Sequence, residues 1–162
     1  MRLTVSKQYL KITFLSLLLG ILCGLDACQK GPLHFEGKIL LPTGRIIDVA
    51  LAKTLPKQAQ GLSGVRDQYL KPHQGMLFIY AQMAPRQFWM PNTYIDLDIF
   101  FLNQDYKVIG IARFMKKHPK GTKGPPAITK QFTAKFILEL RSDSPSSKSI
   151  HLFDTLKYQV RK

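Results

Sequence analysis

The sequence predicts an all-β domain, built as a compact antiparallel β-sandwich or barrel with one or two short helices. Two observations carry this prediction. About eight short apolar runs, rich in β-branched and aromatic residues, alternate with turns rich in Gly, Pro, Asn and Ser. The chain from residue 35 to residue 162 also has the length of one domain with a single core.

The first part of this domain is predicted to be a hairpin followed by a short helix. Phe35–Leu41 and Arg45–Ala52 are partly alternating apolar runs, and the three residues 42–44 between them are typical of a hairpin loop. Thr54 can then cap about one turn of helix, which Gly61 ends. Residues 64–74 are polar and irregular.

The rest of the domain is predicted to be strands joined by polar connections. A loop rich in Lys, Gly and Pro covers residues 115–130, and a Ser-rich turn covers residues 142–149. The strand candidates are Met76–Tyr80, Gln87–Met90, Leu97–Leu102, Tyr106–Arg113, Ala134–Leu140 and Leu156–Val160.

Residues 1–27 are typical of a secretory signal peptide. A basic start is followed by the apolar segment 12–25, which is shorter than the roughly 20 residues that cross a bilayer as a helix. The segment ends in Leu25-Asp26-Ala27-Cys28, which resembles the box of bacterial lipoproteins, in which the cysteine receives a diacylglycerol thioether. Asp26 is an unusual occupant of its position in that box.

We therefore predict three regions: a signal peptide over residues 1–27, a tether over residues 28–34 that is lipidated at Cys28, and a single β-rich domain over residues 35–162. The expected location is the periplasmic face of a membrane in the bacterial cell envelope. An uncleaved membrane anchor and ordinary signal cleavage without lipid are the alternatives. If Cys28 is lipidated and Cys23 is removed, no thiol remains for disulfides, thiolate catalysis or cysteine zinc sites.

The predicted mature chain is strongly basic. The full sequence holds 24 Lys and Arg and 10 Asp and Glu, and residues 1–27 contain three of the former and one of the latter. Residues 28–162 therefore carry 21 basic and 9 acidic groups, a net charge of +12. Such an excess favours anionic partners, and for a tethered protein these are first of all phospholipid headgroups and acidic polysaccharide.

Four short motifs occur in order in the middle of the chain: Gly61-Leu62, Gly75-Met76-Leu77-Phe78, residues 88–93 (Phe-Trp-Met-Pro-Asn-Thr) and Leu97-Asp98-Ile99. With Leu138-Glu139-Leu140 near the end, this pattern resembles the family known as domain of unknown function 192. The resemblance covers residues 45–160 and implies a compact β-sandwich of jelly-roll character with no established activity. The sequence departs from the family pattern at Ser63 and Pro91, and its loop after Met115 lacks the cysteines of many relatives.

The motif over residues 88–93 provides the first candidates for ligand contacts. Trp89 is expected to point away from Phe88 and Met90 in an extended segment, and it is the best single candidate. Asn92 and Thr93 could supply polar contacts, or they could instead form a turn through bonds to the backbone.

Asp98 interrupts an apolar run and is the second candidate. A carboxylate in such a strand must be paired or hydrogen-bonded, because an isolated buried charge is very costly. Asp98 and Arg66 are candidates for ligand contacts. Alternatively, Asp98 could hold the Asn92–Thr93 turn, or it could pair with Arg66 or Arg86. With Asp96 it could also form a carboxylate pair of the kind that glycoside hydrolases use.

Metal binding has weaker support in the sequence. The possible soft ligands of a copper(I) carrier are Met76, Met83, Met90 and Met115, with His73 and Trp89 nearby, but their spacing is irregular and Met commonly fills cores. No pair of histidines has the spacing of zinc ligands. We expect no cofactor.

The basic loop is the strongest electrostatic feature. No acidic residue lies between Asp105 and Glu139. The predicted patch for an anionic partner consists of Arg113, Lys116, Lys117, Lys120 and Lys123. The alternative is a solvated loop. Nucleic acid is not expected, because the loop lacks base-stacking aromatic residues.

These features predict a lipid-anchored accessory or ligand-binding domain of the cell envelope without catalysis. A hydrolase or lyase acting on envelope carbohydrate through Asp98, and a copper carrier, are the alternatives. The sequence leaves the oligomeric state open.

Overall fold

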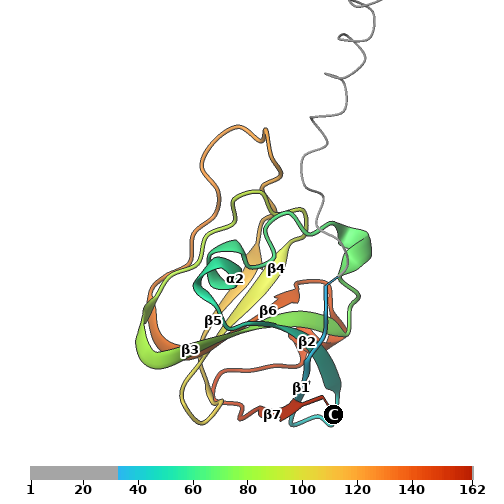
Figure 1. Cartoon of the computed structure of the whole chain (residues 1–162), viewed down its shortest axis with the longest axis vertical. Coiled ribbons are helices and arrows are strands. Elements are labelled where there is room, and N and C mark those ends of the chain that lie inside the picture. The colour runs from blue at the N-terminus through green and yellow to red at the C-terminus, as the bar shows by residue number, and fades with distance from the viewer. Residues whose placement is uncertain (1–32, 162) are drawn as a thin grey trace, which may run out of the picture.

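The computed structural model describes residues 33–161, which form one seven-stranded mixed sheet in the order β5-β4-β6-β3-β2-β1-β7 (Figure 1). The strands are β1 (Gly37–Leu40), β2 (Ile46–Ala52), β3 (Gln74–Arg86), β4 (Leu97–Leu102), β5 (Val108–Met115), β6 (Phe132–Arg141) and β7 (Lys157–Val160). The helices are α2 (Leu55–Gln60), the 3-10 turn η1 (Asp67–Tyr69) and α3 (Pro145–Lys148). The mostly-β prediction is confirmed. The barrel is wrong, because the sheet is open.

The predicted hairpin and helix follow each other at the start of the fold. β1 and β2 pair antiparallel, and Gly44 occupies the positive-φ position of their turn at φ 81°. Thr54 caps α2 through its side chain, which accepts a hydrogen bond from the Lys57 N–H at 3.4 Å. α2 ends at Gly61, which has φ 51°.

One strand pair is parallel, contrary to the antiparallel prediction. β2 and β3 run in the same direction, with Asp48 opposite Gln74 and Ala52 opposite Phe78. The chain between them carries α2 and η1, and it is long enough for the crossover that parallel strands require. This crossover lies over the sheet and later forms one wall of the candidate site.

The two faces of the sheet bury two separate apolar clusters, and β4 shows how they divide. All six residues of β4 are buried, which explains why every one of them except Asp98 is apolar. Leu97, Ile99 and Phe101 belong to the first cluster, whereas Phe100 and Leu102 belong to the second, as expected from alternation along a strand. The first cluster is the one that the crossover covers, since it includes Leu62, Val65 and Leu70.

The second cluster is enclosed by the C-terminal segment rather than by a closing ladder of strands. The segment over residues 150–156, which precedes β7, is hydrogen-bonded to the start of β5. The Val108 N–H donates to the Asp154 carbonyl at 2.8 Å, and the Leu156 N–H donates to the Tyr106 carbonyl at 3.1 Å. The Tyr106 ring stacks on Phe136 with centroids 4.2 Å apart. The segment therefore seals one face while the sheet stays open.

Gly75, in the second of the four motifs, allows β3 and β6 to approach closely. A Cβ at this position would lie 2.6 Å from the Glu139 carbonyl oxygen, a backbone atom that cannot move aside.

We expect Gly75→Ala to lower the free energy of unfolding by about 1–3 kcal/mol, as overpacking does in well-packed cores. Urea unfolding measures this loss. Gly37→Ala is the matched control, because there the nearest atom belongs to the Tyr158 side chain at the sheet edge. Equal losses in the two variants would contradict this reading of Gly75.

Candidate functional site

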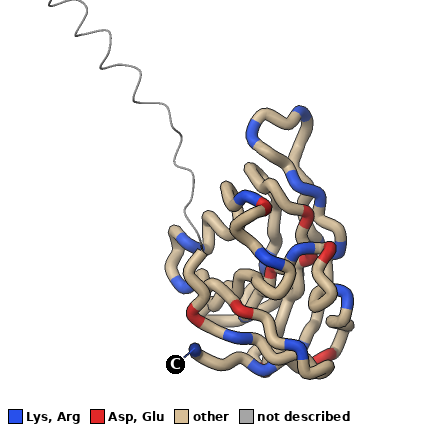
Figure 2. The backbone as a smooth tube through the Cα atoms, turned by 90° about the vertical axis from the view of Figure 1, so that its right-hand side faces the viewer, with Lys and Arg blue, Asp and Glu red and all other residues tan. Residues whose placement is uncertain are grey.

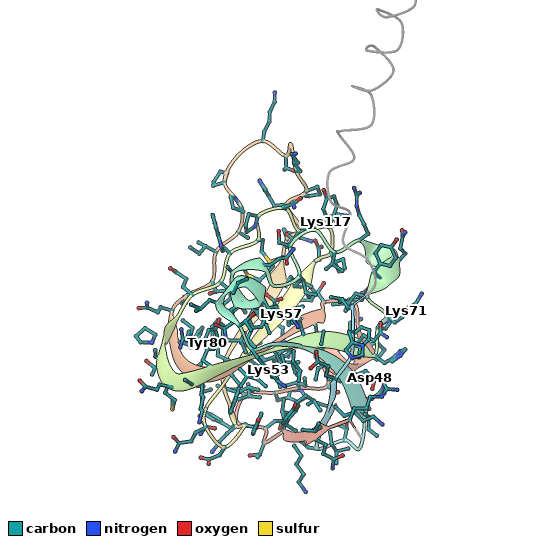
Figure 3. All side chains as sticks on the ribbon, viewed as in Figure 1. Asp48, Lys53, Lys57, Lys71, Tyr80 and Lys117 are labelled. Carbon is teal, nitrogen blue, oxygen red and sulfur yellow. The ribbon has the colours of Figure 1, made fainter. Side chains whose placement is uncertain are left out.

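A cleft opens on the first-cluster face of the sheet, between the end of α2 and the segment over residues 87–93. Its cavity volume is about 190 Å³. The lining residues come from four parts of the chain. They are Gln58, Ala59, Gln60, Gly61, Leu62 and Ser63 from α2 and the turn after it, Phe78 and Tyr80 from β3, Glu139 from β6, and Gln87, Phe88, Trp89, Pro91 and Thr93 from the last segment. Figure 3 labels Tyr80 on β3 just below α2.

The walls of the cleft are held in place by side chains that donate to backbone carbonyls. The Gln58 amide donates to the Ile79 carbonyl at 2.8 Å, which fixes α2 on β3. The Ser63 hydroxyl donates to the Pro91 carbonyl at 3.0 Å, and the Gln87 amide donates to the Thr129 carbonyl at 2.8 Å. The cleft is therefore a preformed feature of the fold and not a gap between loose loops.

Glu139 brings a carboxylate to this cleft from the middle of β6. Its residue is only 5% exposed. It lies opposite Met76 of β3 and Ile99 of β4, and both of these residues belong to the first cluster. Directly opposed residues share a face of a sheet, so Glu139 points toward the crossover. A Cβ built on Gly61 would lie 3.5 Å from Glu139 Oε2, which places the carboxylate against the turn after α2.

Tyr80 adds a hydroxyl beside this carboxylate. Burial raises the pKa of Tyr80 above its ordinary value, the Arg86 guanidinium opposes this rise, and the negative charge of Glu139 adds to it. Arg86 lies over the Tyr80 ring, 3.7 Å from the centroid. Tyr80 therefore stays protonated at neutral pH, as an ordinary tyrosine does.

Trp89 lies at the mouth of the cleft. It is 62% exposed, whereas Met90 beside it is 1% exposed. Phe88 packs against the first cluster and meets Phe78 edge to face, with centroids 4.9 Å apart. The predicted division holds: Phe88 and Met90 face the core, and Trp89 faces outward. Trp89 forms an isolated bridge with Ile128, which ties the mouth of the cleft to the end of the basic loop.

Asn92 and Thr93 hold the turn beside Trp89. Asn92 has φ 52°, and its carbonyl accepts from the Gly64 N–H at 2.8 Å. The Thr93 hydroxyl donates to the Met90 carbonyl at 2.6 Å and accepts from the His118 N–H at 3.2 Å. Thr93 is buried and lines the cleft, but its hydroxyl is engaged in the turn.

Asp98 lies on the opposite face of the sheet from the cleft. It pairs with Leu140 across the strands, and its residue is 1% exposed. Its Oδ2 accepts from Arg113 at 2.7 Å and from the Ser147 hydroxyl at 2.6 Å, while its Oδ1 accepts from the Phe114 N–H at 2.8 Å. The carboxylate thus joins β4, β5 and α3, and its partner is Arg113 and neither Arg66 nor Arg86.

Asp96 and Arg66 have other partners, so the carboxylate pair predicted for a hydrolase is not formed. Asp96 accepts from the Lys117 N–H at 2.8 Å and from Lys116 at 3.0 Å. Partial burial raises the pKa of Asp96, but these two bonds and charges outweigh it and hold the pKa below the ordinary value. Arg66 lies over the Tyr94 ring, 4.1 Å from the centroid.

The predicted basic patch separates into bound and exposed members. Arg113 is taken up by Asp98 and by the carbonyls of Ser147 and Ile150, and Lys116 pairs with Asp96. Lys117, Lys120 and Lys123 are exposed. The loop that carries them projects from one end of the molecule, and its basic positions are blue in Figure 2.

The soft ligands of the copper hypothesis do not gather. Met76, Met90 and Met115 are buried in the first cluster, whereas Met83 is exposed near the far end of β3. Within residues 33–161, no group of three or more His, Cys, Asp or Glu side chains could hold a metal ion.

The predictions for the N-terminus fall on residues 1–32, outside the described part of the chain. They include the signal peptide, Cys28 and most of the tether. In residues 33–161, no helix has both the length and the apolar character needed to cross a membrane.

Comparison with known families supplies the identification. The model of domain of unknown function 192 (DUF192), described as "Uncharacterized ACR", matches residues 39–158. The chain belongs to this family. The match includes every residue that lines the cleft. Among curated proteins, none is significantly similar in sequence.

Two solved structures resemble this DUF192 domain. One, from Sinorhizobium meliloti, is described as a "putative transcription regulator"; it is 25% identical, with a TM-score of 0.60 over 80% of this chain and 97% of the other. The second is a protein of unknown function from Novosphingobium aromaticivorans. It is 24% identical, with a TM-score of 0.61 over 83% of this chain and 99% of the other, and it shows the fold alone.

Sequence reasoning missed Glu139, Tyr80, Gln58 and Gln87 as residues of the candidate site. Glu139 carried a usable signal, because it interrupts the apolar run over residues 136–140 just as Asp98 interrupts β4. The two glutamines carried none. Their place in the cleft depends on how the crossover and the segment after β3 fold back on the sheet.

Proposed function

We propose that this DUF192 protein is a lipid-anchored ligand-binding domain of the bacterial cell envelope, without catalysis, and that its ligand enters the cleft beside Trp89. The single observation that carries the proposal is the cleft. It combines apolar rings with a buried carboxylate and several amides, which is the usual composition of a small-molecule site. Its volume of about 190 Å³ suits a small ligand or one end of a larger one, since drug-sized ligands occupy roughly 300–1,000 Å³.

Binding is favoured over hydrolysis by the way the polar groups are used. Asp98 lies on the far face and is fully hydrogen-bonded, and Asp96 is bound to the basic loop. In the cleft, the Ser63 hydroxyl donates to a backbone carbonyl, and the lining contributed by residues 33–161 includes no histidine. Glu139 is the one carboxylate that the described residues bring to the cleft.

The anchored location rests on the signal-like start of the sequence and on Cys28. From Cys28 to the first described residue, Leu33, the chain can span at most about 17 Å when fully extended. Lipid at Cys28 would therefore hold the domain within reach of the headgroups. The exposed lysines of the loop could then contact anionic lipid, where each cation contributes about 1 kcal/mol.

Fluorescence of Trp89, the only tryptophan, tests the ligand-binding part. The full-length protein in detergent is titrated with cell-wall fragments, soluble lipid headgroups and small amines, with Trp89→Phe as the blank. A saturable change with one class supports the proposal. A flat response to every class, in a protein shown to be folded by circular dichroism, overturns it.

The contact of the loop with the membrane gives a separate prediction. With the protein anchored in vesicles that contain brominated lipid, we expect Trp89 to be quenched more in anionic than in neutral vesicles, because Trp89 adjoins the loop at Ile128. Changing Lys117, Lys120 and Lys123 to Gln should remove the difference. The control triple variant changes Lys71, Lys148 and Lys157, which are exposed elsewhere, and should keep it. Equal quenching in both kinds of vesicle would contradict docking of the loop.

A further inference from the structure

We propose that the cleft takes a ligand through a positively charged ammonium group, held between the Glu139 carboxylate and the aromatic walls. This inference rests on the proposed ligand-binding function and names the chemical class of the ligand. Three independent properties of the cleft support it: the sign of its charge, the polarity of its hydrogen-bonding groups, and its aromatic lining.

The cleft has the opposite charge to the rest of the protein. The chain contains 24 Lys and Arg against 10 Asp and Glu. Yet none of the described residues that line the cleft is Lys or Arg, and one of them, Glu139, is acidic. Because Glu139 is 5% exposed, an ammonium group beside its carboxyl would meet little screening by solvent and would itself favour the ionised form. An anionic ligand would be attracted to the surface of this protein but repelled from this site.

Four of the hydrogen-bond donors that line the cleft are already used within the protein. The amides of Gln58 and Gln87 and the hydroxyls of Ser63 and Thr93 all donate to backbone carbonyls. Within residues 33–161, neither glutamine amide oxygen accepts a hydrogen bond from a described residue, so both oxygens can serve a ligand. A group with donors and no acceptors, such as an ammonium, matches this set.

The aromatic lining of the cleft also favours a cationic ligand. Phe78, Tyr80, Phe88 and Trp89 all line the cleft. Phe78 is fully buried and Arg86 covers one face of Tyr80, so the half-buried Phe88 and the exposed Trp89 are the rings that a ligand cation can reach. Trp89 forms the strongest such contact of the common side chains, and its 62% exposure leaves the ring open to a ligand.

The nearest basic side chains do not reverse this argument. Arg86 is stacked on Tyr80 and also donates to the Gln82 carbonyl at 3.3 Å, and it is not among the lining residues. The Lys57 Nζ of α2 lies 3.9 Å from Glu36 Oε1, and neither residue lines the cleft. Figure 3 labels Lys57 and Lys53 close to α2.

Choline and its uncharged carbon isostere, dimethylbutanol, provide the matched pair of probes, because the two differ in charge and hardly in shape. The full-length protein in detergent is titrated with each probe while Trp89 fluorescence is followed. We expect choline to bind saturably and the isostere to bind at least roughly tenfold more weakly, the loss expected when a charged contact is removed. Acetate, an anion, should leave the fluorescence unchanged.

Two variants test the role of the carboxylate. Glu139→Gln should weaken choline binding by roughly tenfold or more and leave isostere binding unchanged. Since Glu139→Gln can also disturb the fold, Ala59→Lys provides a second test by adding a cation at the exposed rim of the cleft. It should weaken choline binding roughly threefold or more. Leu55→Lys, on the same helix but outside the cleft, is the control and should have no effect.

The outcomes separate this inference from the proposed function. Equal binding of choline and its isostere, or saturable binding of an anionic or sugar probe alone, overturns the ammonium assignment and leaves the ligand-binding proposal standing. A flat response to all probes overturns both. Glycerophosphocholine distinguishes the source of the ammonium group: tighter binding than choline indicates a lipid headgroup, and weaker binding indicates a free amine.

Discussion

Asp98→Ala is expected to lower the free energy of unfolding by about 3 kcal/mol, the lower end of the loss on breaking a buried ion pair, because the Arg113 side chain is 31% exposed. Asp98 is 1% exposed and accepts three hydrogen bonds, from Arg113, Ser147 and the Phe114 backbone. The substitution leaves the Arg113 guanidinium without its carboxylate beside the second cluster. Urea unfolding at neutral pH measures the loss.

Asp96→Ala is the matched control for this prediction. Asp96 is the other carboxylate at the start of β4, but its side chain is 30% exposed and its ion pair with Lys116 is at the surface. Surface pairs contribute about 0–1 kcal/mol, so the expected loss is small. Similar losses for Asp96→Ala and Asp98→Ala would contradict the structural role of Asp98. Ligand binding in the cleft should persist in any Asp98 variant that folds, because Asp98 lies on the far face.

Phe78→Ala is expected to lower the free energy of unfolding by about 3–5 kcal/mol, as other large-to-small aromatic substitutions in cores do. Phe78 is fully buried in the first cluster, contacts Phe88 edge to face, and also lines the cleft. The substitution therefore removes core packing and enlarges the cleft at the same position. Urea unfolding measures the loss of stability. Titration with choline, followed by Trp89 fluorescence, measures the loss of ligand affinity that the enlarged cleft should cause.

Phe88→Ala provides the graded comparison. Phe88 is only half-buried, although it contacts both Phe78 and Phe101. We expect a smaller loss of stability than for Phe78→Ala, together with a comparable loss of ligand affinity, because both rings line the cleft. A larger stability loss for Phe88→Ala would show that the segment over residues 87–93, and not β3, is the main support of the cleft.

Local sequence patterns predicted most elements of the fold. β4 was predicted at its observed bounds, and Thr54 and Gly61 marked the two ends of α2, because these signals depend only on neighbouring residues. The length of β3 was underestimated. Its second half contains Pro85 and several exposed residues, and it is a strand because it pairs with the start of β6. Tertiary pairing of this kind leaves little mark in the local sequence.

The topology of the sheet could not be obtained in the same way. Whether β2 and β3 run parallel depends on the path of the crossover, and the pattern of apolar residues is the same for either direction. For the same reason the closed barrel was a wrong prediction. The chain enclosed the second cluster with the segment over residues 150–156, and the sequence predicted no element for residues 150–155.

The candidate site was partly predictable. The outward orientation of Trp89 followed from alternation, and the structure places Trp89 at the cleft. The paired state of Asp98 followed from the cost of a buried charge, but its partner did not, because Arg113 comes from a neighbouring strand. Glu139 obeys the same rule and was overlooked.

We propose the cleft beside α2 as the ligand-binding site of this protein. Mapping by NMR tests it most directly: the isotopically labelled full-length protein in detergent is titrated with small cationic, neutral and anionic fragments, and the backbone amide shifts are followed. We expect the shifts caused by binding fragments to gather on Gly61, Ser63, Tyr80, Trp89 and Glu139. Saturable shifts that gather elsewhere, or no fragment that moves these amides, would contradict it.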